Sequence, residues 1–230
     1  MAKDRVEAVE RALELLNSFT DAHPVLSLKQ LAEKTGFYKS TILRLAASLE
    51  RFGYLVRQND GSYRLGSTPL RLGEIYRKSF DLRDVVRPVL HDLCERFNES
   101  VAFYIKSNDV RICLYRANAR RAIRHQLEEG QQLPLDRGAA GRVLLAWSGA
   151  EGKPYDDIRS QGWCASLGER DPEVAAVAVP IHSADRQLHG ALCISGLISR
   201  IDEARQHELA AALLQAAAEL SDRLINKSMT

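Results

Sequence analysis

The sequence predicts an α+β protein in which a small helical module precedes a larger domain that contains a sheet. Residues 26–66 contain short helical stretches, a longer helix and two β-rich stretches joined by Asp60-Gly61. That order is typical of a winged helix-turn-helix, which places one helix in the DNA major groove. After Asn98 the apolar residues alternate as in strands, and a long helical stretch ends the chain. Strands framed by a first and a last helix predict one central antiparallel sheet.

The chain length and the distribution of charge indicate two domains. At 230 residues the chain is long for one domain and comfortable for two. We expect a DNA-binding domain over 1–66, a linker helix over 67–80 and a second domain over 81–230. The net charge is only +2, but nine Lys or Arg residues outnumber three Asp or Glu residues between Lys34 and Lys78. This local excess supports nucleic-acid binding by the first domain.

Two helices are predicted before the DNA-reading element. The apolar stripe of the first helix consists of Val6, Val9, Leu13 and Leu16, widened by Ala12, Leu15 and Phe19. Its helical spacing predicts an element that packs against the rest of the domain. Ser27 and Gln30 match a capping box, so we expect a second helix from about Leu28 to Lys34.

A third helix, over about Tyr38–Phe52, is the candidate recognition helix. Its apolar positions fall on one face: Ile42, Leu45, Ala46 and Leu49. The candidate DNA-binding residues at its start lie away from that face or on its edge: Lys39, Ser40, Thr41 and Arg44. Hydroxyl groups bond phosphate oxygens, helix N-terminal amides favour anions, and Arg can pair with guanine. A solvated helix face is the alternative reading, and the neighbouring turn at Gly36 and the hairpin favour DNA.

The hairpin after this helix is the predicted wing. Gly53 is expected to end the helix, and Asp60-Gly61 between Tyr54–Arg57 and Ser62–Leu65 is a strong hairpin signal. Arg57 and Arg64 would flank the wing and reach the DNA backbone or minor groove.

The linker is predicted to be helical and is followed by another helix. Thr68-Pro69 predicts an N-cap and a first helical residue. One face of the linker helix carries the apolar residues Leu72, Ile75 and Tyr76. Such a face can pair with a partner chain. Asp81 is expected to cap the next helix, in which Pro88 predicts a kink or a late start.

The second domain shows a strand pattern interrupted by one short helix. Val101, Phe103 and Ile105 alternate with more polar positions in the first strand. The further strands are predicted at Val110–Ala117, Ile123–Gln126, Val174–Ser183 and Leu188–Ser195, with a turn over Ala184–Gln187. Helices are predicted at Ala139–Trp147 and from about Asp202 to Asn226.

Several of these stretches together resemble the IclR family of bacterial transcriptional regulators. In the first domain the similar segments are VERALELLNSF and residues 26–66, with Ser40, Thr41 and Arg44 in the recognition-helix pattern. In the second they are LPLDRGAAGRVLLAW, GERDPEVAAVAVPI and GALCISGLISRID. The resemblance implies a winged helix-turn-helix joined by a helix to a GAF-like α/β effector-binding domain. It also implies that a homodimer or homotetramer binds double-stranded DNA at a promoter operator, as a repressor or an activator.

The resemblance also places a pocket for a small organic-acid effector. The matching positions are Ala139, Ala140, Ser166, Ala176, Cys193 and Ser195. Family members that bind oxo-acids use backbone amides at the helix start together with Asp, Cys and Ser side chains. Ser166 and Ala176 stand where the family has Asp and Cys, so a bulkier acid, for example an aromatic one, is a hypothesis. Glu169 is interpreted as a solvated loop acid. Only 14 residues separate Trp147 from Gly162, where family members carry a longer helical stretch.

Other classes of function have weaker support. An enzyme could use Cys113 or Cys193 with His125 or His182, but no activating pattern surrounds these residues. A GAF-like sensor without an operator and a nucleoid protein are the remaining alternatives. The four cysteines form no CxxC pair, which is typical of free thiols in a reducing cytoplasm. No run of about 18 apolar residues occurs, and we expect no metal, cofactor, catalytic residue or membrane contact.

Overall fold

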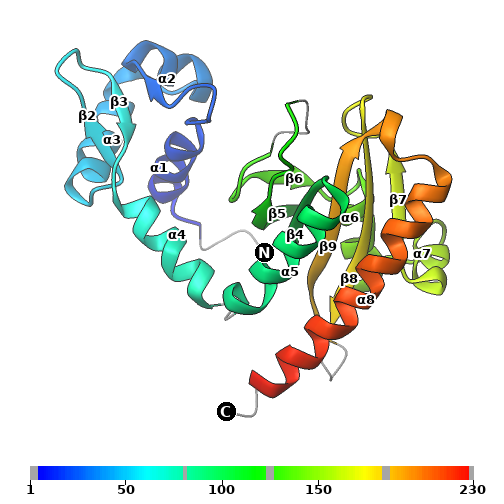
Figure 1. The fold of residues 1–230 in the computed structure, drawn as a ribbon. Helices are drawn as coiled ribbons and strands as arrows, with labels where there is room; N and C mark the ends of the chain where they lie inside the picture. The colour runs from blue at the N-terminus through cyan, green and yellow to red at the C-terminus, as the bar shows by residue number, and fades with distance from the viewer. Residues whose placement is uncertain (1–4, 80–81, 123–126, 183–186, 228–230) are drawn as a thin grey trace. The chain divides into compact units, whose positions relative to one another are not determined.

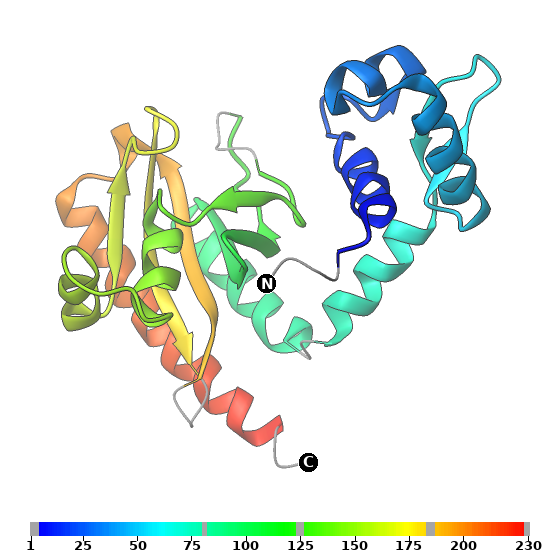
Figure 2. The same cartoon turned by 180° about the vertical axis from the view of Figure 1, so that it is seen from behind.

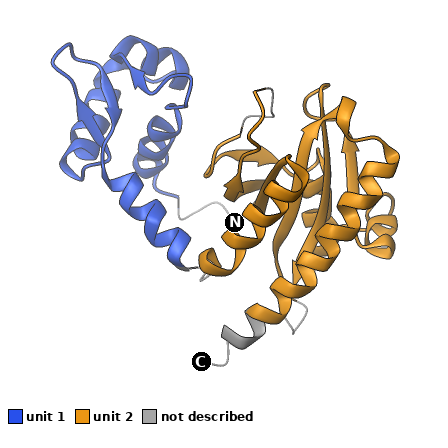
Figure 3. Ribbon diagram, viewed as in Figure 1, with its two compact units in different colours: residues 1–79 blue, residues 80–230 orange. Residues whose placement is uncertain are grey.

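The chain divides into two units, which are coloured separately in Figure 3. The computed structural model describes residues 5–79, 82–122, 127–182 and 187–227. Unit 1 covers residues 1–79 and unit 2 covers residues 80–230. By this division, residues 67–79 of the predicted linker helix fall in unit 1.

Unit 1 is a winged helix-turn-helix, as predicted. Its elements are α1 (Glu7–Asn17), β1 (Val25–Leu26), α2 (Leu28–Thr35), α3 (Lys39–Arg51), β2 (Leu55–Arg57), β3 (Tyr63–Leu65) and α4 (Thr68–Ser79) (Figure 1). The strands form an antiparallel sheet in the order β1-β3-β2. The buried side chains are Leu15, Leu26, Leu31, Ile42, Ala46, Leu49, Leu55 and Tyr63. The short strand β1 was not predicted, because two residues carry no periodic signal.

Local signals set the boundaries of the helices in unit 1. Ser27 and Gln30 form the expected capping box, and α2 ends at Gly36, whose positive φ of 71° suits glycine. The predicted burial of α1 is partly wrong. Leu15 is buried, but Val6, Val9 and Leu13 are 62%, 54% and 53% exposed. The stripe is wider than the surface that the rest of this unit can cover.

Thr68 does not have the predicted capping role. It is the first residue of α4, and its hydroxyl donates to the carbonyl of Phe52 at 2.8 Å. This hydrogen bond ties the start of α4 to the end of α3, so the side chain serves a contact between helices.

Unit 2 is built on one antiparallel sheet, as predicted, and the described residues contribute six strands to it. The strands are β4 (Ser100–Ser107), β5 (Val110–Ala117), β6 (Gln132–Pro134), β7 (Cys164–Leu167), β8 (Val174–His182) and β9 (Leu188–Leu197). Their order is β6-β5-β4-β9-β8-β7. The helices are α5 (Arg83–Phe97), α6 (Ala139–Trp147), α7 (Tyr155–Gln161) and α8 (Glu203–Lys227), with a 3-10 turn at Ile198–Arg200.

Helices cover both faces of this sheet. Helices α5 and α8 lie in front of it in Figure 1, and α6 lies in front of it when the unit is seen from behind in Figure 2. Val101, Phe103 and Ile105 pack with α5 and α8, whereas Ala102 and Tyr104 pack with α6. The positions that alternate with the apolar residues of the first strand are therefore buried rather than polar and exposed, since a second core lies behind them.

Several boundaries in unit 2 differ from the prediction. Helix α5 begins after Leu82, whose side chain makes no capping bond, and Asp81 lies outside the described residues. Pro88 lies within α5 rather than before it, so the helix does not start late. The strand predicted at 123–126 and residues 183–186 of the predicted turn also lie outside the described residues. Strand β7 and helix α7 were missed because each is short and lacks a clear period.

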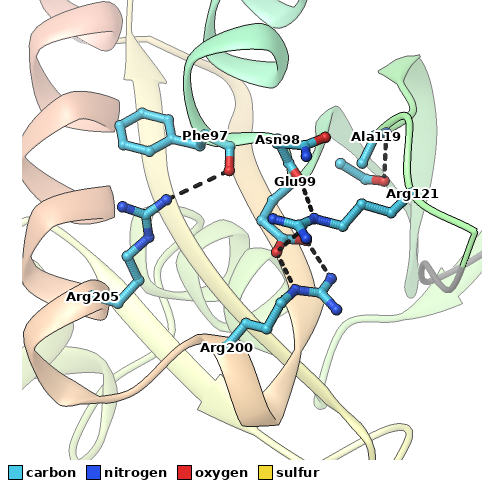
Figure 4. A network of polar contacts seen from close by, with 8 residues as sticks. Phe97, Asn98, Glu99, Ala119, Arg121, Arg200 and Arg205 are labelled. Atoms are coloured by element: carbon cyan, nitrogen blue, oxygen red, sulfur yellow. Dashed lines mark hydrogen bonds and ion pairs between the residues drawn. The ribbon is translucent and has the colours of Figure 1, made fainter.

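A buried carboxylate lies at the centre of a polar network in unit 2. Glu99 is 3% exposed, and its oxygens accept hydrogen bonds from Arg200 at 2.5 and 2.8 Å (Figure 4). Arg121 lies 3.6 Å from the same carboxylate and donates to the carbonyl of Asn98 at 2.7 Å. Arg205 on α8 reaches the carbonyl of Phe97. This network connects the end of α5, the start of β4 and the segment before α8.

We predict that Glu99→Gln destabilises unit 2 by about 1.5–3 kcal/mol, because a neutral amide replaces the buried carboxylate that accepts charge-assisted hydrogen bonds from Arg200. Both tryptophans, Trp147 and Trp163, lie in this unit, so their fluorescence during urea unfolding reports its stability. The control is Arg120→Ala, which removes an exposed pair with Glu95 and should change stability by less than about 0.5 kcal/mol. Equal effects of the two variants would contradict a stabilising role for Glu99.

Candidate functional site

The predicted DNA-reading residues share the exposed side of α3. Lys39, Ser40 and Arg44 are exposed and Thr41 is half-buried, while Ile42, Ala46 and Leu49 on the other side are buried. No side chain caps the N-terminus of α3, so its first amides are open to a phosphate oxygen. Tyr38, the N-cap residue, is 84% exposed and was not singled out from the sequence. An aromatic ring immediately before a recognition helix is the only signal that could have identified it.

The wing places its two arginines on opposite faces. Arg57 lies across from Tyr63 and its guanidinium is 5.8 Å from the centre of that ring. Arg64 lies across from Val56. The tip is held by Asp60, whose carboxylate accepts hydrogen bonds from the hydroxyl and the backbone N–H of Ser62 at 2.6 and 2.9 Å. These bonds lower the pKa of Asp60.

Two glycines hold the wing against the end of α3. The N–H of Gly66 donates to the carbonyl of Tyr54 at 2.8 Å, and the N–H of Thr68 donates to the carbonyl of Gly53 at 3.0 Å. A Cβ atom on Gly66 would lie 2.1 Å from the carbonyl oxygen of Gly53. This close approach of two backbone segments therefore requires glycine and fixes α4 relative to the recognition helix.

In unit 2 the sheet register brings the six predicted pocket positions together. Ser166 on β7 lies across from Ala176 on β8, and Ala176 lies across from Ser195 on β9. Cys193, two residues before Ser195, is on the same face because side chains alternate along a strand. Ala139 and Ala140 at the start of α6 complete the group, and all six line one cavity of about 40 Å³. The other lining residues include Tyr104, Arg111, Gly138, Glu169 and Arg170.

The N-terminus of α6 already has hydrogen-bond partners. The N–H of Gly138 donates to Glu169 at 2.9 Å, and the N–H of Ala139 donates to the hydroxyl of Ser166 at 3.0 Å. The other carboxylate oxygen of Glu169 pairs with Arg142 at 3.0 Å. Interpreting Glu169 as a solvated loop acid is therefore wrong, because its carboxylate caps a helix. A run of loop residues gives no sign of that partner, which lies 31 positions away.

Arg111 is the buried cation of this cavity and was missed from the sequence. It is 4% exposed, and its Nη1 donates to the carbonyls of Pro134 and Arg137 at 2.8 and 2.5 Å. Its guanidinium lies 5.4 Å from the centre of the Tyr104 ring. Burial lowers the pKa of Arg111 and raises that of Tyr104. Nothing in the strand pattern distinguishes this arginine from a solvent-facing one.

The cysteines carry no sign of activation. Burial raises the pKa of Cys113 and Cys193 to about 12, and the two thiols lie near the carbonyls of Tyr115 and Ile194. A nucleophilic thiol needs a lowered pKa, so these residues fit a core role. His182 packs on Trp147 with ring centres 5.8 Å apart, and His125 lies outside the described residues.

The part of the chain that the structure describes has neither a metal-binding cluster nor a membrane-spanning helix. No group of three His, Cys, Asp or Glu side chains there could hold a metal ion. Among the same residues, no helix has the length and apolar character needed to cross a bilayer.

Comparison with known families decides the class of the protein. A profile described as IclR helix-turn-helix domain matches residues 8–59, and one described as bacterial transcriptional regulator IclR C-terminal matches residues 75–155 and 152–222. The chain belongs to the IclR family of transcriptional regulators. The two stretches matched by the C-terminal profile overlap at residues 152–155, which lie between Trp147 and Gly162.

Similar proteins agree with this assignment over nearly the full length. The chain is 26% identical to the HTH-type transcriptional regulator KipR of Bacillus subtilis, over 96% of this chain and 98% of the relative. It is 27% identical to the HTH-type transcriptional regulator XynR of Escherichia coli, over 95% and 97%. The IclR family transcriptional regulator from Brucella abortus shares the fold, with a TM-score of 0.76, 24% identity and coverage of 96% and 94%.

One structural neighbour was crystallised with an organic acid. This IclR homolog from Microbacterium hydrocarbonoxydans, in complex with 4-hydroxybenzoate, has a TM-score of 0.77 and 19% identity. The alignment covers 94% of this chain and 98% of the neighbour. At this identity the comparison shows a shared fold.

We predict that Gly66→Ala destabilises unit 1 by about 2–3 kcal/mol, because the new Cβ would overlap the Gly53 carbonyl. The matched control is Gly73→Ala within α4, which has no atom within 4 Å of the added Cβ. It should stabilise the helix by about 0.5–1 kcal/mol. Hydrogen exchange followed by mass spectrometry reports protection in residues 26–66 separately from unit 2. Equal protection in the two variants would contradict the packing described for Gly66.

Proposed function

We propose that this protein is a ligand-responsive repressor or activator that binds a promoter operator through α3 and the wing. In this proposal a small organic acid in the cavity of unit 2 controls DNA binding, and the protein acts in the cytoplasm as a homodimer or homotetramer. The observation that carries the proposal is the presence, in one chain, of an uncapped basic recognition helix and a separate unit with a built cavity.

The DNA-binding role is assigned to six residues. They are Lys39, Ser40, Thr41, Arg44, Arg57 and Arg64. The open amides and hydroxyl groups at the start of α3 suit phosphate oxygens, and Arg44, one turn later, can reach a base edge. Arg57 and Arg64 on the two faces of the wing suit the backbone or the minor groove on either side.

The effector-binding role is assigned to the six positions that line the cavity. They are Ala139, Ala140, Ser166, Ala176, Cys193 and Ser195. A cavity of about 40 Å³ has room for only a few water-sized groups, which favours a compact acid over the bulkier one that the small residues suggested. Ser166 and Ala176 are smaller than the Asp and Cys that the family has at these positions. Arg111 and Tyr104 occupy part of the space that these smaller side chains leave.

Exposed apolar side chains on α1 and α4 support self-association. Val9 and Leu13 are 54% and 53% exposed, and Leu70, Ile75 and Tyr76 on α4 are 66%, 54% and 43% exposed. Such groups on a small unit are typical of surfaces that another chain covers. A dimer would present two recognition helices to two half-sites. An acid that changes their spacing would change operator affinity by population shift.

The direct test is selection of bound DNA from a random pool, with and without organic acids. The proposal expects one enriched sequence with related half-sites and a change in recovery when an effective acid is present. A pool that remains random would contradict an operator-binding role and favour a sensor without an operator.

We predict that Arg44→Ala weakens binding to the selected sequence by about 1–3 kcal/mol and relaxes base choice at one position, because a bidentate contact is lost. Affinity for random DNA serves as the control and should change less. An equal loss on both DNAs would make Arg44 a phosphate contact.

We also predict that Ile75→Asp lowers self-association, because it places a charge on an apolar surface that a second chain would bury. Sedimentation velocity over a range of concentrations measures the effect. The control is Leu65→Asp on the wing, where an apolar residue with 38% exposure receives the same charge. A monomer–oligomer equilibrium that responds equally to both substitutions would exclude α4 as the specific contact.

A further inference from the structure

Two arginines of unit 2 share an environment but differ in their charged partners. The guanidinium groups of Arg87 and Arg111 each lie 5.4 Å from the centre of a tyrosine ring, Tyr115 and Tyr104 respectively. Each arginine also has a buried Nε without a hydrogen-bond partner. Arg87 pairs with the carboxylate of Glu129 at 2.9 Å. Arg111 has no carboxylate within 4.0 Å among the residues that the structure describes, although it is the more deeply buried of the two.

The acids that line the cavity, Glu169 and Asp171, and the neighbouring Asp136 each have another partner. Glu169 caps α6 and pairs with Arg142. Asp171 accepts a hydrogen bond from the N–H of Glu173 at 3.1 Å, and the exposed Asp136 lies 3.8 Å from Arg137. Two backbone carbonyls solvate one nitrogen of Arg111 but supply no negative charge. A buried cation in this state is costly unless an anion reaches it.

Arg111 faces the cavity at the start of α6. Its Nη2 is 3.1 Å from the position that a Cβ on Gly138 would occupy, and it makes no hydrogen bond to the described residues. Gly141 lets the guanidinium approach the helix, because a Cβ there would lie 2.2 Å from Nη1. Tyr104 and Arg111 both line the cavity together with Ser195 and Cys193. The cation is thus held in place by the loop carbonyls and turned towards the space assigned to the effector.

We propose that Arg111 is the residue that makes this cavity select an anionic ligand, by pairing its guanidinium with the carboxylate of a compact organic acid. The rest of the acid lies against Ala176, Cys193 and Ser195. This inference rests on the proposed function, which assigns the cavity to an organic acid. It adds a positive charge that recognises the acid, at a helix start where Glu169 and Ser166 already accept the N–H groups of Gly138 and Ala139.

The test compares acids with their neutral amides by titration calorimetry on the full chain. The probes are 2-oxobutanoate, butanoate and 4-hydroxybenzoate, each with the corresponding amide. We expect at least one compact acid to bind and its amide to bind roughly 30-fold more weakly or worse, since the amide leaves the buried cation unpaired. Equal binding of an acid and its amide, or no binding by any of the three acids, would overturn the proposal.

Variants separate recognition of charge from support of the fold. Arg111→Met should remove most of the difference in affinity between the acid and its amide, with the exposed Arg170 of the same lining left in place, whereas Arg111→Lys should keep the preference for the acid. If Arg111 had only a structural role, Arg111→Met would weaken binding of the acid and of its amide equally. The matched control is Arg87→Met, which removes the arginine that has its own carboxylate and should leave the ratio of the two affinities unchanged. Retention of the full acid preference in Arg111→Met would also overturn the proposal.

Folding and function can be checked independently. Circular dichroism and the melting temperature without ligand show whether Arg111→Met is folded. If Arg111→Met is not folded, the ratio of acid to amide affinity in the wild-type protein and in Arg111→Lys decides whether the proposal holds. DNA selection depends on unit 1, so a protein that selects an operator but binds acids without regard to Arg111 refutes this inference alone. A protein that binds acids through Arg111 but selects no DNA refutes only the operator role.

Discussion

The register of the six-stranded sheet is the constraint on which the sensor unit depends. Ser166, Ala176 and Ser195 lie in one row across β7, β8 and β9, and Cys193 lies in the next row on the same face. A slip of one residue in β8 would turn Ala175 and Val177 towards α6 and remove the row from the cavity. Burial of both faces makes such a slip costly, because the other face packs on α5 and α8. The packing of the core therefore also sets the chemistry of the cavity.

In unit 1 the corresponding constraint is the contact between two backbone segments at Gly53 and Gly66. It positions the wing beside α3, and the Thr68 hydroxyl joins α4 to the end of the recognition helix. A displacement of α4 would therefore be passed on to α3. A ligand can shift DNA affinity only by its difference in affinity between two arrangements of the protein. The contacts at Gly66 and Thr68 are where such a difference would reach the DNA-reading residues.

Much of this could be predicted from the sequence because the deciding signals are local. The capping box at Ser27, the turn at Asp60-Gly61 and the apolar spacing of α3 each act within a few residues. The six cavity positions came from resemblance to a family. Strand β7 and helix α7 are too short to carry a periodic signal, and the apolar stripe of α1 predicts packing without showing which surface would cover it. Arg111 could not be identified as a cavity residue, since its carbonyl partners lie 23 and 26 residues away in the chain. The sequence also does not reveal that no carboxylate of the described residues pairs with it.

Titration of an operator–protein complex with an effective acid, followed by fluorescence anisotropy of the DNA, tests the link between the two units most directly. The apparent Kd for DNA should change by a constant factor at saturating acid, and DNA should change the Kd for the acid by the same factor, as linkage requires. Arg111→Met should bind the operator like the wild type and not respond to the acid. An acid that occupies the cavity of the wild-type protein without changing its Kd for the operator would contradict control of DNA binding from this site.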